Sequence, residues 1–299
     1  MTFAKPKIVE KNAAMLGRIG ISSWTYPWAM GTVPDYCPHK PMSVSALVRK
    51  AAELQVQVVQ VADNQPLDNL TSAELRILRE LAREHAVELQ VGTRGVDHSH
   101  LLKYLRIAQQ LGAKLVRTLG GLPGHPAPIS EIQDNINSIL PTFIEAGVSI
   151  ALENYEVYQT RDLAHLVSRI GHANFGICLD VTNSFATPEG AEQILENLAP
   201  FAINVHLKDF TIERTNHLMG FTCIGRPIGN GQLPLGLILQ RLTAFNRRPD
   251  LIVELWPPFQ NTLKDTLALE SAWATESVNY LRSFLDDFNK NRSEPTAVS

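Results

Sequence analysis

Eight short apolar runs that alternate with segments of helical spacing predict an α/β fold, a single closed (β/α)8 barrel. No linker or change in composition divides the 299 residues into separate domains. The glycine-rich phosphate fingerprints of open α/β sheets are missing, so a doubly wound sheet is the weaker alternative. We therefore expect one domain over residues 1–299, with residues 1–17 and 288–299 as flexible ends.

Each predicted strand is a run of apolar, β-favouring residues bounded by turn signals. In chain order, these runs cover residues 18–24, 56–64, 87–95, 114–121, 148–156, 175–183, 202–210 and 250–257. Apolar residues recur at helical intervals in segments 43–54, 71–86, 97–112, 130–146, 160–171, 188–199, 234–246 and 263–286. Thr71 with Glu74, and Ser130 with Glu131, predict the caps of the second and fourth helices.

The composition excludes several classes of protein. A formal net charge of −3 and the lack of long lysine and arginine runs argue against a nucleic-acid binder. No stretch approaches the roughly 18 apolar residues that cross a membrane, and the charged N-terminus does not form a secretory signal. Cys37, Cys178 and Cys223 share no metal-type spacing, and Cys178 fits a small buried thiol. We expect a cytoplasmic, reduced protein.

Four ionisable residues stand late in the last four predicted strands: Glu153, Asp180, His206 and Glu254. The carboxyl ends of parallel barrel strands converge on one mouth, where these side chains can meet. One such carboxylate alone would more often be a helix cap or an ion-pair partner. Three carboxylates buried together would repel one another unless a cation joined them. Since the set is rich in oxygen and has no thiolate, one Mn, Co or Mg ion is favoured over structural zinc.

These residues lie in motifs that resemble the xylose-isomerase-like TIM barrels, a superfamily of sugar and sugar-phosphate isomerases and epimerases. The motifs are LENY with Glu153, CLDVTN with Asp180, VHLKD with His206 and Lys208, VEL with Glu254, and the loop IGRPIGNG at 224–231. The resemblance covers about Ile19 to Leu285. It implies that the quartet binds one divalent metal ion and that the substrate is a small carbohydrate. Barrels of this type often pair, which leaves a homo-oligomer open.

The resemblance also implies a reaction. In ketose epimerases of the superfamily, one glutamate removes a proton beside a metal-bound carbonyl and the other returns it on the opposite face. Glu153 and Glu254 would take these roles through a metal-bound cis-enediolate, which Lys208 would neutralise or protonate. An ion pair with Asp209 is the alternative role for Lys208. The leading prediction is therefore an isomerase or epimerase of a small ketose, sugar acid or sugar derivative.

One position departs from the epimerase pattern. Asn183 stands where those enzymes commonly carry a histidine; its amide can bind the substrate through a hydrogen bond to a hydroxyl but cannot shuttle protons near neutral pH. The same metal chemistry on a keto sugar acid gives the alternative, a decarboxylase or dehydratase. A phosphodiester hydrolase resembling apurinic-site endonucleases is disfavoured by the acidic charge and the single ligand histidine. A non-catalytic sugar-binding barrel would leave the quartet without a purpose.

Four further residues are predicted to contact the substrate. Arg94 and Arg117 end the third and fourth strands, where a guanidinium suits a carboxylate or phosphate. Tying strand ends together through carboxylates is an equally good role for them. Arg226 lies in the long loop after the seventh strand, which either closes over the site or is solvated. Trp24 ends the first strand and is the predicted wall for the apolar face of a sugar.

Overall fold

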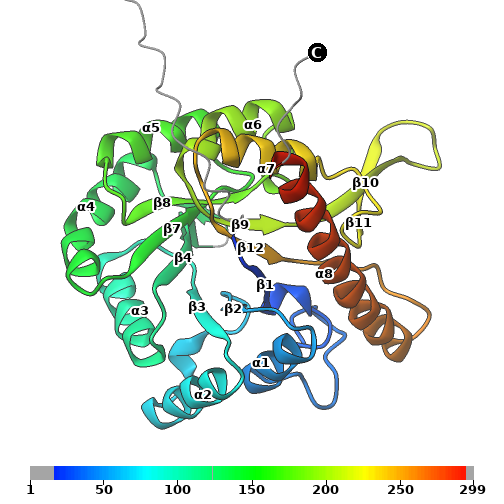
Figure 1. The fold of residues 1–299 in the computed structure, drawn as a ribbon, viewed down its shortest axis with the longest axis horizontal. Coiled ribbons are helices and arrows are strands. Elements are labelled where there is room, and N and C mark those ends of the chain that lie inside the picture. The colour runs from blue at the N-terminus through cyan, green and yellow to red at the C-terminus, as the bar shows by residue number, and fades with distance from the viewer. Residues whose placement is uncertain (1–16, 123, 294–299) are drawn as a thin grey trace, which may run out of the picture.

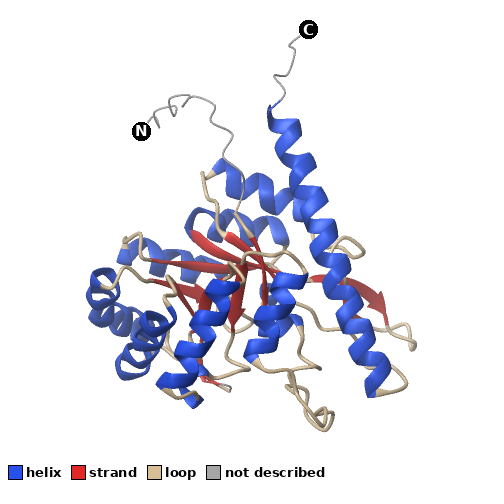
Figure 2. Cartoon of the chain, turned by 60° about the horizontal axis from the view of Figure 1, so that its bottom comes forward, coloured by secondary structure: helices blue, strands red, loops and turns tan. Residues whose placement is uncertain are grey.

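The computed structural model describes residues 17–122 and 124–293, and its centre is a closed barrel of eight parallel strands. Figures 1 and 2 show the helices arranged around these strands. The barrel strands are β1 (Ile19–Ser22), β2 (Val58–Val61), β3 (Glu88–Gly92), β4 (Leu115–Leu119), β7 (Ser149–Glu153), β8 (Phe175–Asp180), β9 (Ala202–Leu207) and β12 (Asp250–Val253). They follow one another in chain order, and β12 closes the barrel by pairing with β1. The predicted fold class is confirmed.

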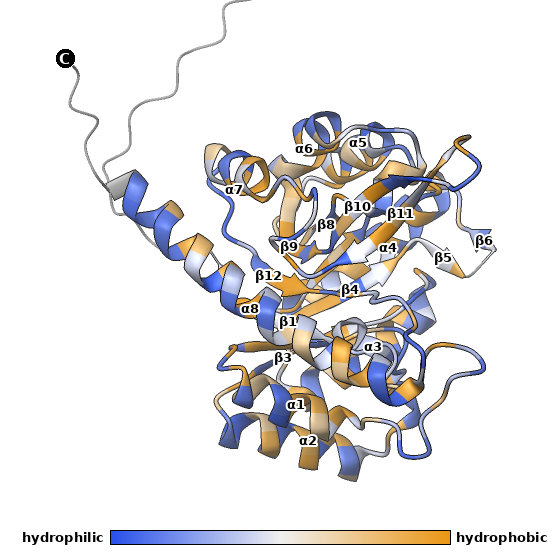
Figure 3. Ribbon diagram, turned by 90° about the vertical axis from the view of Figure 1, so that its right-hand side faces the viewer, coloured by the Kyte–Doolittle hydropathy of each residue, from blue (hydrophilic) through white to orange (hydrophobic). Residues whose placement is uncertain are grey.

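Eight helices of the described chain surround the barrel, each with one apolar face turned inward. They are α1 (Val44–Glu53), α2 (Ser72–Glu84), α3 (His98–Leu111), α4 (Ile129–Glu145), α5 (Thr160–Ile170), α6 (Ala191–Leu198), α7 (Leu235–Ala244) and α8 (Leu263–Ser293). Figure 3 shows apolar strands enclosed by helices of mixed polarity. Of these helices, none is long and apolar enough to cross a membrane.

One predicted helix cap is confirmed and the other is wrong. Thr71 and Glu74 form the expected capping box, in which each side chain receives the other's backbone N–H. Helix α4 starts directly after Pro128, so Ser130 lies within its first turn and gives no cap.

The prediction of a flexible end is wrong for residues 288–293, which continue α8. Leu281 and Leu285 of this helix are buried, and Phe284 and Phe288 pack against the same core. This apolar face continues past the predicted end, and the helix continues with it. Of the other residues predicted to be flexible, 1–16 and 294–299 lie outside the described residues.

The long loop expected after the seventh barrel strand is a hairpin of β10 (Asp209–Arg214) and β11 (Phe221–Arg226). Figure 1 shows it projecting from the barrel. Asp209 fixes the glycine-rich segment that follows β11, because its carboxylate accepts hydrogen bonds from the backbone N–H groups of Gly229, Gly231 and Leu233 at 2.8–3.0 Å. A Cβ atom at Gly231 would collide with that carboxylate. Smaller elements are β5 (Gly121–Leu122), β6 (His125–Pro126), η1 (Ser23–Thr25), η2 (Leu67–Asn69), η3 (Asn183–Ala186) and η4 (Ala199–Phe201).

Candidate metal centre

A cavity of about 350 Å³ opens where the carboxyl ends of the barrel strands converge. Its lining includes seven of the ten predicted site residues: Trp24, Arg94, Arg117, Glu153, Asn183, Lys208 and Glu254. Asp180 and His206 lie buried next to this lining, since Lys208 contacts the first and Glu254 the second. The structure thus brings together nine of the ten predicted residues.

Two of the four predicted metal ligands, Glu153 and Glu254, lie beside Nδ1 of His206. This atom lies 3.5 Å from Glu153 Oε1 and 3.4 Å from Glu254 Oε1. Asp180, His206 and Glu254 offer ligand atoms that all lie within 4.8 Å of one another. The carboxyl ends of β7, β8 and β9, with the residue after β12, therefore place three carboxylates around one imidazole.

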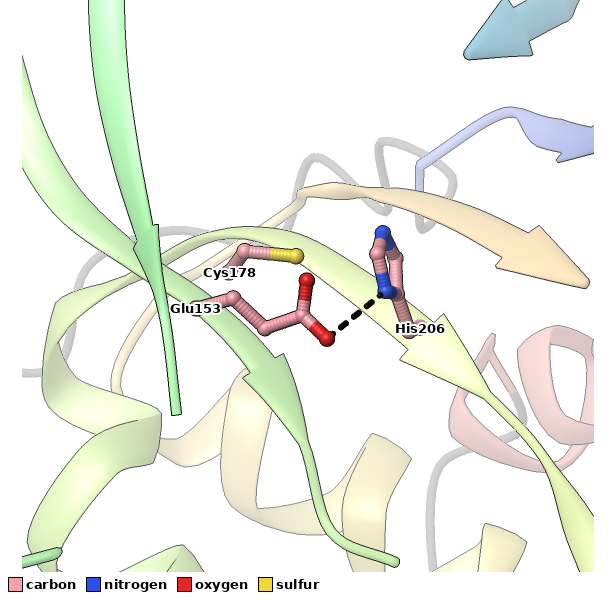
Figure 4. Close-up of side chains that lie close together, drawn as sticks. All are labelled: Glu153, Cys178 and His206. Carbon is pink, nitrogen blue, oxygen red and sulfur yellow. Dashed lines mark ion pairs between the residues drawn. The ribbon is translucent and has the colours of Figure 1, made fainter. Parts of the chain in front are cut away.

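Cys178 also lies beside Glu153 and His206, as Figure 4 shows. Burial raises the pKa of this thiol to about 11, so it stays protonated at neutral pH. Its Sγ atom contacts Asn204 Oδ1 at 3.3 Å. The predicted small buried thiol is confirmed, and the carboxylates and the imidazole remain the better ligands for a hard divalent ion.

Two buried atoms, His206 Nδ1 and Asp180 Oδ2, test whether these residues fit a cation. Among the described residues, His206 Nδ1 is buried without a hydrogen-bond partner, and the buried Asp180 Oδ2 has no hydrogen bond but an ion pair with Lys208 Nζ at 2.7 Å. An unsatisfied buried polar atom costs about 1–3 kcal/mol, and more for a charged group. Asp180 and His206 belong to the same ligand set, so one divalent ion would give the nitrogen a partner and would neutralise the carboxylate. The residues present fit such an ion.

Ion pairs balance the carboxylates in the structure as it stands. Lys208 Nζ lies 2.7 Å from Asp180 Oδ2 and 3.1 Å from Glu254 Oε2, so Asp209 is not its partner. Burial would lower the pKa of Lys208, but these carboxylates raise it well above its ordinary value. Burial would raise the pKa of Glu153, yet Arg117 and His206 hold it well below its usual range. Without a metal ion the site is thus a network of charged pairs.

The two predicted arginines differ in how many of their hydrogen-bond donors remain available for a ligand. Arg117 is buried; its guanidinium donates to Glu153 and, at 2.8 Å, to Asp63 Oδ1, so it ties strand ends together. Arg94 donates through Nε to Asp63 Oδ2 at 3.3 Å, and 27% of its side chain is exposed. Within the described chain, its two terminal nitrogens have no hydrogen bond to another residue. Arg94 therefore keeps donors for a ligand.

Asp63 is a site residue that the sequence reasoning missed. It receives hydrogen bonds from Arg94, Arg117 and, at 3.4 Å, Trp24 Nε1. Burial would raise its pKa, but the Arg117 guanidinium lowers it, so the carboxylate stays charged. Asp63 stands late in the second predicted strand run, at the position that identified the quartet in the other strands.

Asn183 connects the ligands to Lys208. Its Nδ2 donates to Glu153 Oε1 at 2.9 Å, and its Oδ1 accepts from Lys208 Nζ at 3.1 Å. Trp24 forms an apolar side of the cavity together with Leu255 and Trp256. Both residues lie where the sequence predicted them.

Arg226 does not line the cavity. It lies on β11, and its Nη2 contacts Glu213 Oε1 of β10 at 2.5 Å. The cross-strand ion pair holds this side chain within the hairpin, which the sequence reasoning had taken for a loop. Its predicted contact with the substrate is therefore not supported by its position.

Metal binding should release a proton from His206. Burial would lower the pKa of this imidazole, but the carboxylates of Glu254 and Glu153 hold it well above its ordinary value. Below that raised pKa, a metal ion has to displace the proton, so we expect the affinity for Mn²⁺ to fall as pH falls through neutrality. Calorimetry in two buffers of different ionisation enthalpy measures this release, and binding at pH 7 without it would contradict the assignment.

Comparisons with known proteins identify the family of this barrel. The chain is 33% identical over 264 residues to the 3-oxo-isoapionate decarboxylase of Pectobacterium atrosepticum, covering 88% of this chain and 94% of that protein. A xylose isomerase-like TIM barrel protein of Mycobacterium smegmatis in complex with magnesium has a similar fold, with 14% identity, a TM-score of 0.67, and coverage of 91% and 98% of the two chains.

The D-psicose 3-epimerase of Clostridium cellulolyticum H10, solved with D-tagatose, has the same fold, again with 14% identity and a TM-score of 0.67 over 90% of this chain and 99% of that one. The family model described as xylose isomerase-like TIM barrel matches residues 48–283. This chain belongs to the xylose isomerase-like TIM barrel family.

Proposed function

We propose that the protein is a divalent-metal-dependent lyase that decarboxylates a 3-oxo sugar acid. The observation that carries this proposal is the pair of free terminal nitrogens on Arg94, in the same cavity as Glu153 and Glu254. A guanidinium is well suited to a carboxylate, which a neutral ketose lacks. The similarity to a decarboxylase of a 3-oxo acid supports the same choice over the isomerase predicted first.

Different residues of the cavity would bind the metal ion and the substrate. Glu153, Asp180, His206 and Glu254 would hold the metal ion. Arg94 would bind the substrate carboxylate, and Trp24 would cover the apolar face of the carbon chain and exclude water. When bound, the divalent ion would supply a Lewis acid that stabilises negative charge on the substrate's oxygen atoms.

The reaction needs one bond cleavage and one proton delivery. The bond between the carboxylate carbon and the neighbouring carbon breaks, and carbon dioxide leaves. The electron pair stays on the substrate, delocalised onto the 3-oxo oxygen, and the neighbouring carbon then takes one proton. Lys208 lines the cavity as an ammonium group and is the proposed proton donor.

This reaction fits the state of Glu153 better than epimerisation does. An epimerase needs two carboxylates that act as bases on opposite faces of the substrate. Glu153 is bound by Arg117 and Asn183, and a carboxylate whose pKa is lowered in this way is a weak base. Decarboxylation removes no proton from carbon, so it requires no such base. Epimerisation stays the second candidate, because Glu153 and Glu254 both line the cavity.

The test is to incubate Mn²⁺-loaded protein in D2O with 3-oxo-isoapionate and other 3-oxo sugar acids. We expect carbon dioxide release and one deuterium on the carbon that loses the carboxylate. D-psicose and D-tagatose serve as neutral ketoses. Deuterium beside their carbonyl, with no carbon dioxide from any acid, would reject the lyase and favour the epimerase.

Arg94→Gln should weaken binding of the acid substrate. Loss of a charge-assisted hydrogen bond costs about 1.5–3 kcal/mol, so KM should rise roughly 10- to 100-fold with a smaller change in kcat. Steady-state kinetics of carbon dioxide release measures both constants. Arg161→Gln, at a residue with 65% of its side chain exposed on α5, is the matched control and should leave KM unchanged. An Arg94→Gln enzyme with an unaltered KM would remove Arg94 from the substrate site.

The cellular setting is proposed from the sequence. All three cysteines are free, which supports a reduced compartment such as the cytoplasm. The homo-oligomer stays a prediction, which sizing of the purified protein would check.

A further inference from the structure

A chain of buried amides connects His206 to the amino-terminal end of the barrel. Gln60 of β2, Gln90 of β3 and Asn204 of β9 are buried within mostly apolar strands. Gln60 Oε1 lies 2.7 Å from His206 Nε2. Gln60 Nε2 donates to Gln90 Oε1 and to Asn204 Oδ1, both at 3.0 Å.

The hydrogen bond to Asp250, at the end of this chain away from His206, determines which group donates and which accepts in each of the other hydrogen bonds. The Asp250 carboxylate can only accept, and it receives Gln90 Nε2 at 2.9 Å. The carbonyl oxygen of Gln90 therefore faces the barrel interior, where it accepts from Gln60 and from Asn204. Gln60 has thus turned its NH2 group away from His206 and presents only an oxygen to it. Because that oxygen is an acceptor, Nε2 of His206 must carry a proton.

Reversing the Gln60 amide would be costly. Its oxygen would then face Gln90 Oε1 and Asn204 Oδ1, and two buried hydrogen bonds would be lost. Its NH2 group would face His206 Nε2 and would require a lone pair there. The network therefore excludes the imidazole tautomer in which Nε2 is the free nitrogen.

We infer that Gln60 is a positioning residue that keeps Nδ1 of His206 available for the metal ion. Nδ1 is the remaining ring nitrogen, it is buried without a hydrogen-bond partner in the described chain, and it faces Glu153 and Glu254. A hydrogen bond to one ring nitrogen fixes which nitrogen can bind a metal. The inference rests on the metal site of the proposed function and is independent of the reaction that follows.

The test compares two substitutions of similar size by their affinity for Mn²⁺ alone. Gln60→Met removes the acceptor, and Gln60→Glu keeps an oxygen against Nε2. We expect Gln60→Met to weaken Mn²⁺ binding about 10- to 100-fold, the usual effect of losing such a partner. Gln60→Glu loses the hydrogen bonds to Gln90 and Asn204 just as Gln60→Met does, so a higher Mn²⁺ affinity of Gln60→Glu isolates the effect of the oxygen against Nε2, and we expect it. Gln65→Met is the control, because Gln65 donates to Met30 O and lies outside the network; it should bind Mn²⁺ as the wild type does.

Two outcomes separate this inference from the proposed function. If the wild type binds no Mn²⁺, the metal site and the positioning role both fall. If the wild type binds Mn²⁺ and a folded Gln60→Met protein binds it equally well, or if Gln60→Glu loses as much affinity as Gln60→Met, only the positioning role falls.

A measurement on the wild type covers the case in which Gln60→Met does not fold. In Mg²⁺-loaded protein with ¹⁵N-labelled histidine, the His206 signals, assigned by their loss in His206→Gln, should show the ring proton on Nε2. A proton on Nδ1 would overturn the inference.

Discussion

Replacing Asp180 with asparagine is expected to abolish both turnover and the stabilisation that a bound divalent ion gives to the folded state. Asp180 is buried, its Oδ2 forms an ion pair with Lys208 at 2.7 Å, and it belongs to the ligand set with His206 and Glu254. An amide at this position loses the charge that a hard cation requires. An ion at 100 times its Kd stabilises the wild type by about 2.7 kcal/mol, and the variant should lose this gain.

Thermal unfolding with and without Mn²⁺, together with carbon dioxide release, measures these effects for Asp180→Asn. The control is Asp162→Asn, at an exposed residue of α5, which should behave as the wild type does. Unfolding in chelator shows whether the variant itself folds. An Asp180→Asn protein that keeps the Mn²⁺-dependent shift and the wild-type rate would show that Asp180 is not a ligand.

Lys208→Met is expected to lower kcat about 10²- to 10⁴-fold, the usual contribution of a positioned proton donor. The affinity for Mn²⁺ should not fall, because the Lys208 ammonium contacts oxygens of Asp180 and Glu254 that the ion would use. KM should change less than kcat, since the proton is delivered after the substrate has bound.

Single-turnover kinetics in D2O measures the proton step for Lys208→Met, and calorimetry measures its Mn²⁺ affinity. Lys103→Met is the matched control, because Lys103 forms an exposed ion pair with Asp68 on the outside of the barrel. A variant that retains nearly the wild-type kcat would assign proton delivery to another group. A large loss of Mn²⁺ affinity would instead show that Lys208 supports the ligands.

The alternation of side chains along strands is the reason that the metal site could be predicted from sequence. In a barrel strand every second residue faces inward, and parallel strands all end at one mouth. Glu153, Asp180 and His206 each stand at or near the end of a predicted run, so their convergence follows from the fold. The same argument applies to Asp63, which lies two residues after β2 and was not predicted as a site residue.

The partners of the arginines could not be predicted, because they depend on distances across the barrel. Arg94 and Arg117 lie in neighbouring predicted strand runs and have the same chemistry. The structure shows that Arg117 is bound to Glu153 and Asp63, whereas Arg94 keeps two nitrogens free. Nothing in the local sequence distinguishes these two environments.

Two other errors arose from contacts that local patterns do not encode. The hairpin that holds Arg226 depends on the cross-strand pairing of β10 with β11. The extension of α8 depends on Phe288, which packs on the core beyond the predicted end of the helix. The polar residues Gln60 and Gln90 were visible within apolar strands, but their link to His206 required the closed barrel.

The central claim is that carbon dioxide release from a 3-oxo sugar acid depends on one metal ion held by Glu153, Asp180, His206 and Glu254. Its most direct test is to titrate Mn²⁺ into chelator-treated protein while carbon dioxide release is recorded. The rate should rise from near zero and level off at one ion per chain. Full activity in the metal-free protein would contradict the claim.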